Sequence, residues 1–303
     1  MHFEITPVGF NPAEYYLRAS RGVDLTEFSL GTRMRELGIG EDDLESDARV
    51  NTFRTAGAFN PRLPTTLLLP GIAIEADVTF QHQIEVLKIH GNVVYVDYAN
   101  QVFDQEVLRA QILDFMESDA ARREGANLMG LSFGSSAILD LLVESPEADL
   151  SKLRRVILLG AIFSPDDLGE TLGKFIRSAG SNAHRVKTHV KKVLDKEYFT
   201  SGIFNEEDVI AGINEDSDGA LVARNQVVSK REFNIEDIEG PPRDIPALLI
   251  WWSGRAEVQP DRQHIIADYF TETVIARIPG LHGQVATQAK FINPLVDGFL
   301  SLT

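Results

Sequence analysis

Apolar residues in this chain gather in short runs of strand length, which alternate with longer segments of helical spacing. The strand-like runs cover residues 66–69, 92–96, 126–131, 155–160, 246–252 and 273–278. Helical spacing of apolar residues follows at 80–90, 107–116, 135–144, 259–270 and 285–302. Continuous apolar strands alternating with helices are typical of the α/β class. They predict a mostly parallel, doubly wound sheet with helices on both faces.

Two segments interrupt this alternation. Residues 1–64 suggest an N-terminal extension, and the expected elements there are edge strands near 4–10 and 48–59 and a helix near 25–37. Residues 162–243 are too long for a simple loop. They carry helical patterns of their own, near 166–178, 184–196 and 205–213. We therefore expect a core made of 65–161 and 244–303, with 162–243 inserted as a helical cap or lid.

Charge and cysteine content narrow the function classes. The 303 residues include 45 Asp and Glu against 29 Lys and Arg, a net charge of −16, which argues against nucleic acid and against an anionic membrane surface. Because cysteine is absent, a thiol nucleophile, a disulfide framework and a cysteine metal site are excluded. The chain shows no signal-peptide pattern and no apolar run of membrane-spanning length, so we expect a cytoplasmic protein without stable membrane insertion. Nothing in the pattern indicates an oligomeric state.

The most informative motif is the pentapeptide Gly130-Leu131-Ser132-Phe133-Gly134, which reads Gly-x-Ser-x-Gly. A strand-like run precedes it and a helical segment follows it. A strand, a sharp turn and a helix form a nucleophile elbow, in which the serine hydroxyl stands exposed at the tip. Glycines on both sides remove the Cβ atoms that would clash in so tight a turn. The motif therefore predicts Ser132 as a catalytic nucleophile.

A serine nucleophile needs a base, usually a histidine that a carboxylate orients. His282 is the candidate base, because it follows the last strand in a glycine-flanked loop. Glu257 is the candidate acid, since it follows the strand 246–252 and completes the order serine, acid, histidine. Asp166 and Asp167, which follow another strand end, are alternatives for the acid. A further rival, Asp261, lies within the next helix.

Backbone N–H groups should bind the oxyanion. The candidates are the N–H of Phe133, after the nucleophile, and the N–H of Ile72, in the loop where Gly71 permits a close turn. The cap supplies aromatic candidates for an acyl pocket: Phe163, Phe175 and Phe199. We expect no cofactor and no metal, because no histidine pair stands at ligand spacing with a carboxylate partner.

Basic residues of the cap form an island in an otherwise acidic chain. They lie between Lys174 and Lys196, together with His184 and His189. The simpler interpretation is a solvated helix face. The alternative is a docking surface for an anionic partner such as a phosphorylated acyl carrier.

These motifs, taken in order, resemble those of the α/β-hydrolase superfamily, over residues 65–160 and 245–302. The segments that carry the resemblance are 67–71, 94–98, 130–134, 245–251 with 254–257, and 279–283. The resemblance implies a Ser132 nucleophile, a Glu257 acid and a His282 base. The chain departs from common patterns in having Pro70-Gly71 in the oxyanion loop, Asp97-Tyr98-Ala99-Asn100 after its strand, and Ser135 and Ser136 after the elbow. No subfamily can be assigned.

The sequence thus predicts a serine hydrolase that cleaves a carboxylic ester of a small acyl substrate through an acyl-enzyme on Ser132. A thioesterase, an acyltransferase or a carbon–carbon bond hydrolase would use the same site. The alternative outside enzymes is a ligand-binding or signalling protein that keeps the triad without turnover.

Overall fold

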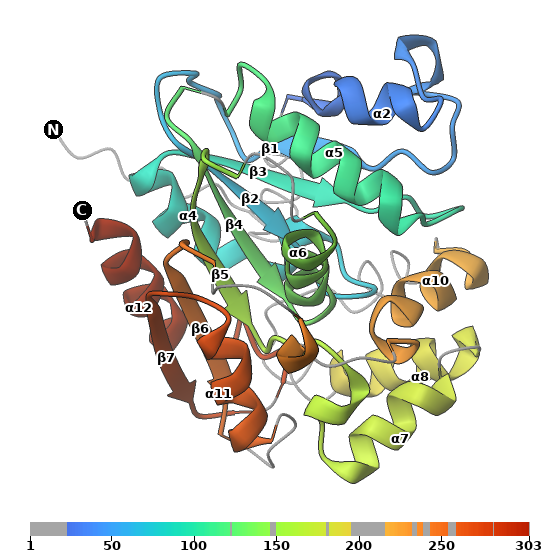
Figure 1. Cartoon of the computed structure of the whole chain (residues 1–303), viewed down its shortest axis with the longest axis vertical. Coiled ribbons are helices and arrows are strands. Elements are labelled where there is room, and N and C mark those ends of the chain that lie inside the picture. The colour runs from blue at the N-terminus through green and yellow to red at the C-terminus, as the bar shows by residue number, and fades with distance from the viewer. Residues whose placement is uncertain are drawn as a thin grey trace, which may run out of the picture.

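A twisted sheet runs through the centre of the molecule in the computed structural model (Figure 1). The structure describes residues 23–302 apart from 122, 146–149, 180–181, 195–215, 232–234, 239–242, 254–258 and 281. Within that part of the chain the sheet has seven strands in the order β1-β3-β2-β4-β5-β6-β7. The strands are β1 Thr52–Thr55, β2 Thr65–Leu69, β3 Asn92–Asp97, β4 Ala126–Leu131, β5 Leu153–Leu159, β6 Ala247–Trp252 and β7 Thr273–Ile278.

The pairing confirms the predicted fold class. Only β1 is antiparallel to its neighbour, β3, and the pairs from β3 through β7 are all parallel. Strand β1 lies within the edge strand expected at 48–59. The edge strand expected at 4–10 lies outside the described residues. All carboxyl ends from β2 to β7 therefore meet at one edge of the sheet, where ligands of such sheets bind.

Side chains of the inner strands alternate between two apolar cores, one on each face of the sheet. In β2, for example, Leu67 and Leu69 join one core and Leu68 joins the other. The first core is covered by α5 (Gln105–Glu117), α6 (Phe133–Glu144) and α11 (Pro260–Asp268), and the second by α3 (Ala76–Thr79), α4 (Gln81–His90) and α12 (Ala289–Ser301). Both faces are thus buried, which explains why the strands read as continuous apolar runs.

The N-terminal helix expected at 25–37 is split in the structure. The segment forms η1 (Thr26–Ser29) and α2 (Thr32–Glu36), and η2 (Glu41–Asp43) follows. The break has a tertiary cause, because the carboxylate of Asp114 in α5 accepts hydrogen bonds from the backbone N–H groups of Gly31 (2.7 Å) and Met34 (3.0 Å). These are first-turn donors that lack a partner inside a helix, so Asp114 fixes where α2 begins.

Between β5 and β6 the chain leaves the sheet and forms a group of helices beyond the carboxyl ends of the strands (Figure 1). They are η3 (Pro165–Asp167), α7 (Glu170–Ala179), α8 (Ala183–Leu194), α10 (Asp218–Ser229) and η5 (Ile235–Asp237). Helices α7 and α8 match the patterns at 166–178 and 184–196, and the third pattern, at 205–213, lies outside the described residues. The domain limits 1–64, 65–161 with 244–303, and 162–243 remain predictions.

Several cations of the basic island are ion-paired within the chain. Lys174 pairs with Glu170, and Lys187 pairs with Asp218 at 3.0 Å. Arg177 pairs with Asp166. These pairs reduce the charge that three of the island's cations would offer an anionic partner, which favours the interpretation as a solvated helix face. No helix among the described residues is long and apolar enough to cross a membrane.

Candidate active site

Ser132 stands at a sharp turn between β4 and α6, as the motif predicts. Its backbone angles are φ 51° and ψ −109°, and it has the only positive φ of any non-glycine residue in the described part of the chain. Such a conformation costs about 1–3 kcal/mol and persists only where the surroundings enforce it. Here the Ser132 N–H donates to the carbonyl of Leu159 in β5, at 2.8 Å. The strained serine is therefore held by the neighbouring strand.

The two glycines of the pentapeptide are required by space. A Cβ atom at Gly130 would lie 2.5 Å from the backbone carbon of Gly134, and one at Gly134 would overlap the carbonyl oxygen of Leu69 in β2. Both approaches would be far closer than van der Waals contact. The predicted reason for these glycines, a backbone folded tightly on itself, is confirmed, and the structure adds that α6 starts in direct contact with β2.

Two serines follow the elbow, and their hydroxyl groups bind its backbone. Ser135 Oγ lies within hydrogen-bond distance of the carbonyls of Gly130 (2.7 Å) and Leu159 (3.1 Å). Ser136 Oγ lies 3.2 Å from the carbonyl of Ser132 and 2.5 Å from that of Ile162. Both side chains are buried. The hydroxyl groups of Ser135 and Ser136, in the first turn of α6, thus stabilise the backbone of the elbow.

His282 reaches the serine from the loop after β7. Its Nε2 atom lies 2.8 Å from Ser132 Oγ, a hydrogen-bond distance between residues 150 positions apart. Gly160, with φ 61°, passes so close that a Cβ atom there would lie 2.6 Å from His282 Cε1. The Trp252 ring stands roughly edge-on to the imidazole, with the centroids 5.6 Å apart. The imidazole is therefore confined on two sides.

The carboxylate partner of the histidine is not decided by the described contacts. Glu257 lies outside the described residues. Both alternatives after β5 have other partners: exposed Asp166 pairs with Arg177, and the buried Asp167 accepts from the N–H groups of Phe163 (2.7 Å) and Ser164 (2.8 Å) and pairs with Arg262 (2.9 Å). Asp261 is exposed in the first turn of α11. Because the Asp167 carboxylate already binds two backbone N–H groups and Arg262, it is a poor candidate for the triad acid.

The two predicted oxyanion donors come from the loop after β2 and from the start of α6. Phe133 is the first residue of α6, so its N–H has no acceptor within the helix. Ile72 lies two residues beyond Pro70, and its side chain packs against the core. Gly71 between them is not at a positive φ, and a Cβ atom there would lie 3.9 Å from Leu131 Cδ2. A side chain with a Cβ atom would therefore fit at position 71, and the roles of Ile72 and Phe133 as oxyanion donors stay predictions.

Three aromatic rings pack together beside the elbow. Tyr98 and Phe103 both meet Phe133 edge-on, at centroid distances of 5.2 and 5.6 Å, and they contact each other at 5.9 Å. The Tyr98 hydroxyl donates to the carbonyl of Pro70 at 3.1 Å. Arg224 of α10 lies over the Tyr98 and Phe103 rings at 5.3 and 5.7 Å. The elbow, the loop after β2 and α10 thus meet at one cluster of aromatic side chains.

Of the three aromatic residues predicted to line the acyl pocket, the structure describes the side chain of Phe163 only. Phe163 is 1% exposed, packs in the core and lies under the guanidinium of Arg231 at 4.2 Å. That is the position of a core residue rather than of an open pocket wall. Phe175 lies in α7, and its side chain is outside what the structure describes, as is the whole of Phe199.

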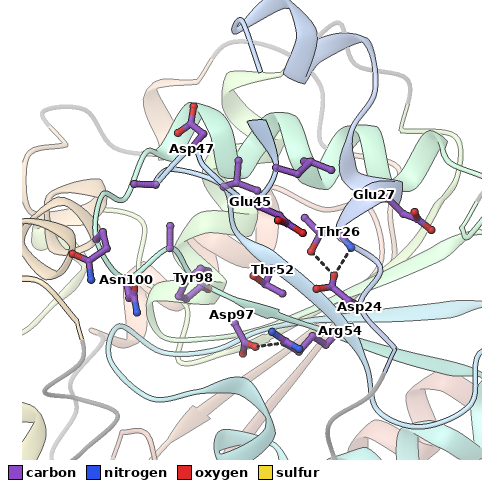
Figure 2. A pocket seen from close by; sticks show the side chains of 15 residues that line it. Asp24, Thr26, Glu27, Glu45, Asp47, Thr52, Arg54, Asp97, Tyr98 and Asn100 are labelled. Atoms are coloured by element: carbon purple, nitrogen blue, oxygen red, sulfur yellow. Dashed lines mark hydrogen bonds and ion pairs between the residues drawn. The ribbon is translucent and has the colours of Figure 1, made fainter. Parts of the chain in front are cut away.

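A separate cavity of about 630 Å³ lies between the N-terminal segment and the loop after β3 (Figure 2). Among the described residues, its lining includes the carboxylates of Asp24, Glu27, Glu45, Asp47 and Asp97 beside a single cation, Arg54. Figure 2 shows Asp97 turned toward Arg54, at 3.2 Å. Burial is the main cause that raises the pKa of Asp97 to about 7; Asp77 and Glu75 raise it further, and Arg54 opposes them.

Sequence reasoning missed the residues that support the site from a distance. Tyr98 stands in the segment 94–98, but nothing in the sequence indicates its contacts with Pro70 and Phe133. Phe103 and Arg224 belong to no motif, and Ser135 and Ser136 stand out only as departures from a common pattern. Trp252 lies in a predicted strand, but nothing in the sequence indicates its contact with His282. Gly160 could have been predicted to lie near the site, because it follows a strand that ends at the same sheet edge as Ser132.

The strand order, the two helical layers and the elbow after β4 together define the α/β-hydrolase fold, and solved structures bear this out. The chain is similar to 2-hydroxy-6-oxo-6-phenylhexa-2,4-dienoate hydrolase from a Rhodococcus species, with 16% identity over 84% of this chain and 96% of that one and a TM-score of 0.61. It is also similar to an epoxide hydrolase from Bacillus megaterium, with 15% identity over 83% and 98% and a TM-score of 0.63.

A third similar structure is the carboxylesterase CesB from Bacillus subtilis, with 16% identity over 83% of this chain and 87% of that one and a TM-score of 0.56. No protein-family model matches the sequence, and no curated protein matches it either. The likeness therefore establishes the fold. The names of these proteins differ in substrate, a dienoate, an epoxide and a carboxylic ester, so the fold by itself does not select the bond that is cleaved.

Proposed function

We propose that this protein is a serine hydrolase that cleaves a carboxylic ester by way of an acyl-enzyme on Ser132. The observation that carries the proposal is the 2.8 Å separation between His282 Nε2 and Ser132 Oγ at the strained tip of the elbow. A serine hydroxyl becomes nucleophilic when an adjacent base accepts its proton, and this separation is within hydrogen-bond reach. The fold adds support, since its ligands bind at the sheet edge where both residues lie.

In the proposed reaction Ser132 Oγ attacks the ester carbonyl carbon while its proton passes to His282 Nε2. The carbonyl oxygen becomes an oxyanion, which the N–H groups of Ile72 and Phe133 bind. The intermediate collapses, the C–O bond to the alcohol breaks, and His282 donates its proton to the leaving alkoxide. Water then attacks the acyl-enzyme with His282 as base, which releases the carboxylic acid and restores Ser132.

Glu257 is the proposed acid that orients His282 and stabilises the imidazolium. The supporting arguments are its place after β6 and the other partners that Asp166 and Asp167 already have. Segment 162–243 is the proposed cap, because its described helices lie beyond the carboxyl ends of the strands (Figure 1). Phe175 and Phe199 stay as proposed pocket residues in it.

The test is a panel of small esters, thioesters, diketones and epoxides, offered to the wild type and to Ser132→Ala and His282→Ala. We expect ester hydrolysis to fall roughly 10⁴-fold or more in each variant, because triad members act as a unit. His264→Ala, which changes an exposed histidine of α11, is the matched control and should keep full activity. Ester hydrolysis that survives in Ser132→Ala would exclude the acyl-enzyme.

The same panel separates the alternatives. Faster turnover of thioesters or diketones would reassign the site to a thioesterase or a carbon–carbon bond hydrolase with the same nucleophile. Transfer of the acyl group to an added alcohol in preference to water would indicate an acyltransferase. Absence of turnover for every class, with a ligand that protects Ser132 from labelling, would favour the ligand-binding alternative.

A further inference from the structure

We propose that Arg224 and Tyr98 are positioning residues that clamp the oxyanion loop from both sides and so aim the N–H of Ile72. This inference rests on the proposed function, because it assigns these residues a role in the same site. Neither residue belongs to the elbow or to the proposed triad. Arg224 comes from α10, in the segment between β5 and β6, and Tyr98 follows β3.

Arg224 is buried, and both terminal nitrogens of its guanidinium are bound in this corner of the molecule. Its side chain is 2% exposed, and both terminal nitrogens bind the carboxylate of Asp216, at 2.8 and 3.0 Å. The same nitrogens donate to two backbone carbonyls: Nη1 to that of Ile72 and Nη2 to that of Ala99, each at 2.9 Å. The planar fork of an arginine can serve such a set of acceptors at once, whereas a lysine ammonium cannot match that geometry.

The hydroxyl of Tyr98 holds the other end of the loop through its 3.1 Å hydrogen bond to the Pro70 carbonyl. Its ring packs against Phe133, which carries the second proposed oxyanion donor. Arg224 in turn lies over the Tyr98 ring. The two clamping side chains therefore support each other as well as the loop.

The consequence for the oxyanion donor follows from the order of the peptide groups. The Ile72 N–H belongs to the peptide between Gly71 and Ile72. The peptide before it carries the Pro70 carbonyl, bound by Tyr98, and the peptide after it carries the Ile72 carbonyl, bound by Arg224. Gly71 has the conformational freedom of a residue without a Cβ atom, and a Cβ atom there would meet only Leu131, at 3.9 Å, so the residue itself leaves the plane of this peptide free to turn. Clamps on both sides supply the orientation that the glycine leaves open.

Arg224 is one of several side chains and backbone groups that attach α10 to the core. The N-terminal end of α10 has its own anchors, since Ser217 donates from its N–H to the Asn100 carbonyl (2.7 Å) and from its hydroxyl to the Gln101 carbonyl (2.6 Å). Lys187 also binds the Asp216 carbonyl at 3.1 Å. A buried ion pair is weak evidence for stability, because desolvation offsets its attraction. A buried arginine that also binds Ile72 is better explained by the position it imposes on that loop.

The test compares Arg224→Lys, which keeps the charge beside Asp216, with Tyr98→Phe, which keeps the ring and removes only the hydroxyl. For the ester that the wild type hydrolyses, we expect kcat to fall roughly 10- to 100-fold in Arg224→Lys and about 3- to 10-fold in Tyr98→Phe, with KM nearly unchanged. Misaimed oxyanion donors weaken transition-state binding and not substrate binding. Affinity for a trifluoromethyl ketone, which forms an oxyanion adduct, should fall in parallel with kcat.

Lys187→Met is the matched control, because it removes another cation that binds the Asp216 segment without contacting the oxyanion loop. It should leave kcat within about twofold of wild type. A second readout is independent of activity: hydrogen exchange of the peptide that contains the Ile72 amide should speed up in Arg224→Lys and Tyr98→Phe and not in Lys187→Met.

The clamp is overturned if a folded Arg224→Lys keeps wild-type kcat and wild-type hydrogen exchange at Ile72, or if Lys187→Met lowers kcat as much. A wild type that is inert toward every substrate, with Ser132 unreactive toward a fluorophosphonate, would overturn the proposed function and this role with it. An active wild type with an unaffected Arg224→Lys would overturn the clamp alone.

Discussion

At the scale of single residues, the structure places several groups in environments that cost free energy. Ser132 adopts a strained backbone conformation, and the Asp97 carboxyl lies partly buried near two other carboxylates. Arg54 offsets part of this cost by its contact with Asp97 at 3.2 Å. Asp97 titrates near neutrality as a result, and its charge is a source of pH-dependent stability.

We predict that the protein loses stability as the pH rises from 5 to 8, through ionisation of Asp97. Its folded pKa of about 7 is above the value of about 3.9 in an unfolded chain, so the folded state binds this proton more tightly. The stabilisation is complete below the unfolded pKa and disappears as the pH passes the folded pKa.

Urea unfolding of the wild type and of Asp97→Asn at pH 5 and pH 8 measures this effect. The free energy of unfolding of the variant, relative to wild type, should rise by about 1–2 kcal/mol between the two pH values. This is less than the full shift implies, since the carboxylate is partly solvated and paired with Arg54. A difference between the proteins that does not change with pH would show that Asp97 does not titrate in this range.

At the scale of elements, periodicity predicted almost every described strand and helix of the core. The helix expected near 25–37 is split instead, because Asp114, 83 positions from Gly31, fixes a helix start at Thr32. No local pattern contains that information. The pentapeptide likewise predicts a glycine at 134, but it does not indicate that the Leu69 backbone of β2 packs against this position.

Alanine should be damaging at Gly134 and well tolerated at Gly71. In Gly134→Ala the new methyl group would meet the Leu69 backbone, so α6 and β2 must separate; we expect a loss of about 2 kcal/mol or more in stability and a large loss of ester hydrolysis. In Gly71→Ala the methyl group fits, and stability should stay within about 1 kcal/mol of wild type.

Thermal unfolding and ester hydrolysis of both variants provide the measurement. Equal damage from the two substitutions would contradict the packing at the elbow. So would a Gly134→Ala protein as stable and as active as the wild type.

At the scale of the whole molecule, the fold brings together residues that are far apart in the sequence. Ser132 and His282 could be predicted as partners, because each follows a strand end and such ends share one edge of a parallel sheet. Arg224 could not, since its contact with Ile72 spans 152 positions and depends on how α10 packs. The fold and the candidate nucleophile could therefore be predicted from the sequence, whereas the contact of Arg224 with the loop after β2 is visible only in the structure.

The central claim is that Ser132 is an activated nucleophile, and covalent labelling tests it most directly. The wild type, Ser132→Ala and His282→Ala are treated with a fluorophosphonate, and the adduct is located by peptide mass spectrometry. We predict one adduct per chain on the peptide containing Ser132 in the wild type, none in Ser132→Ala, and labelling slowed by roughly 10³-fold or more in His282→Ala. An adduct on another residue, or undiminished labelling of Ser132→Ala, would contradict the account.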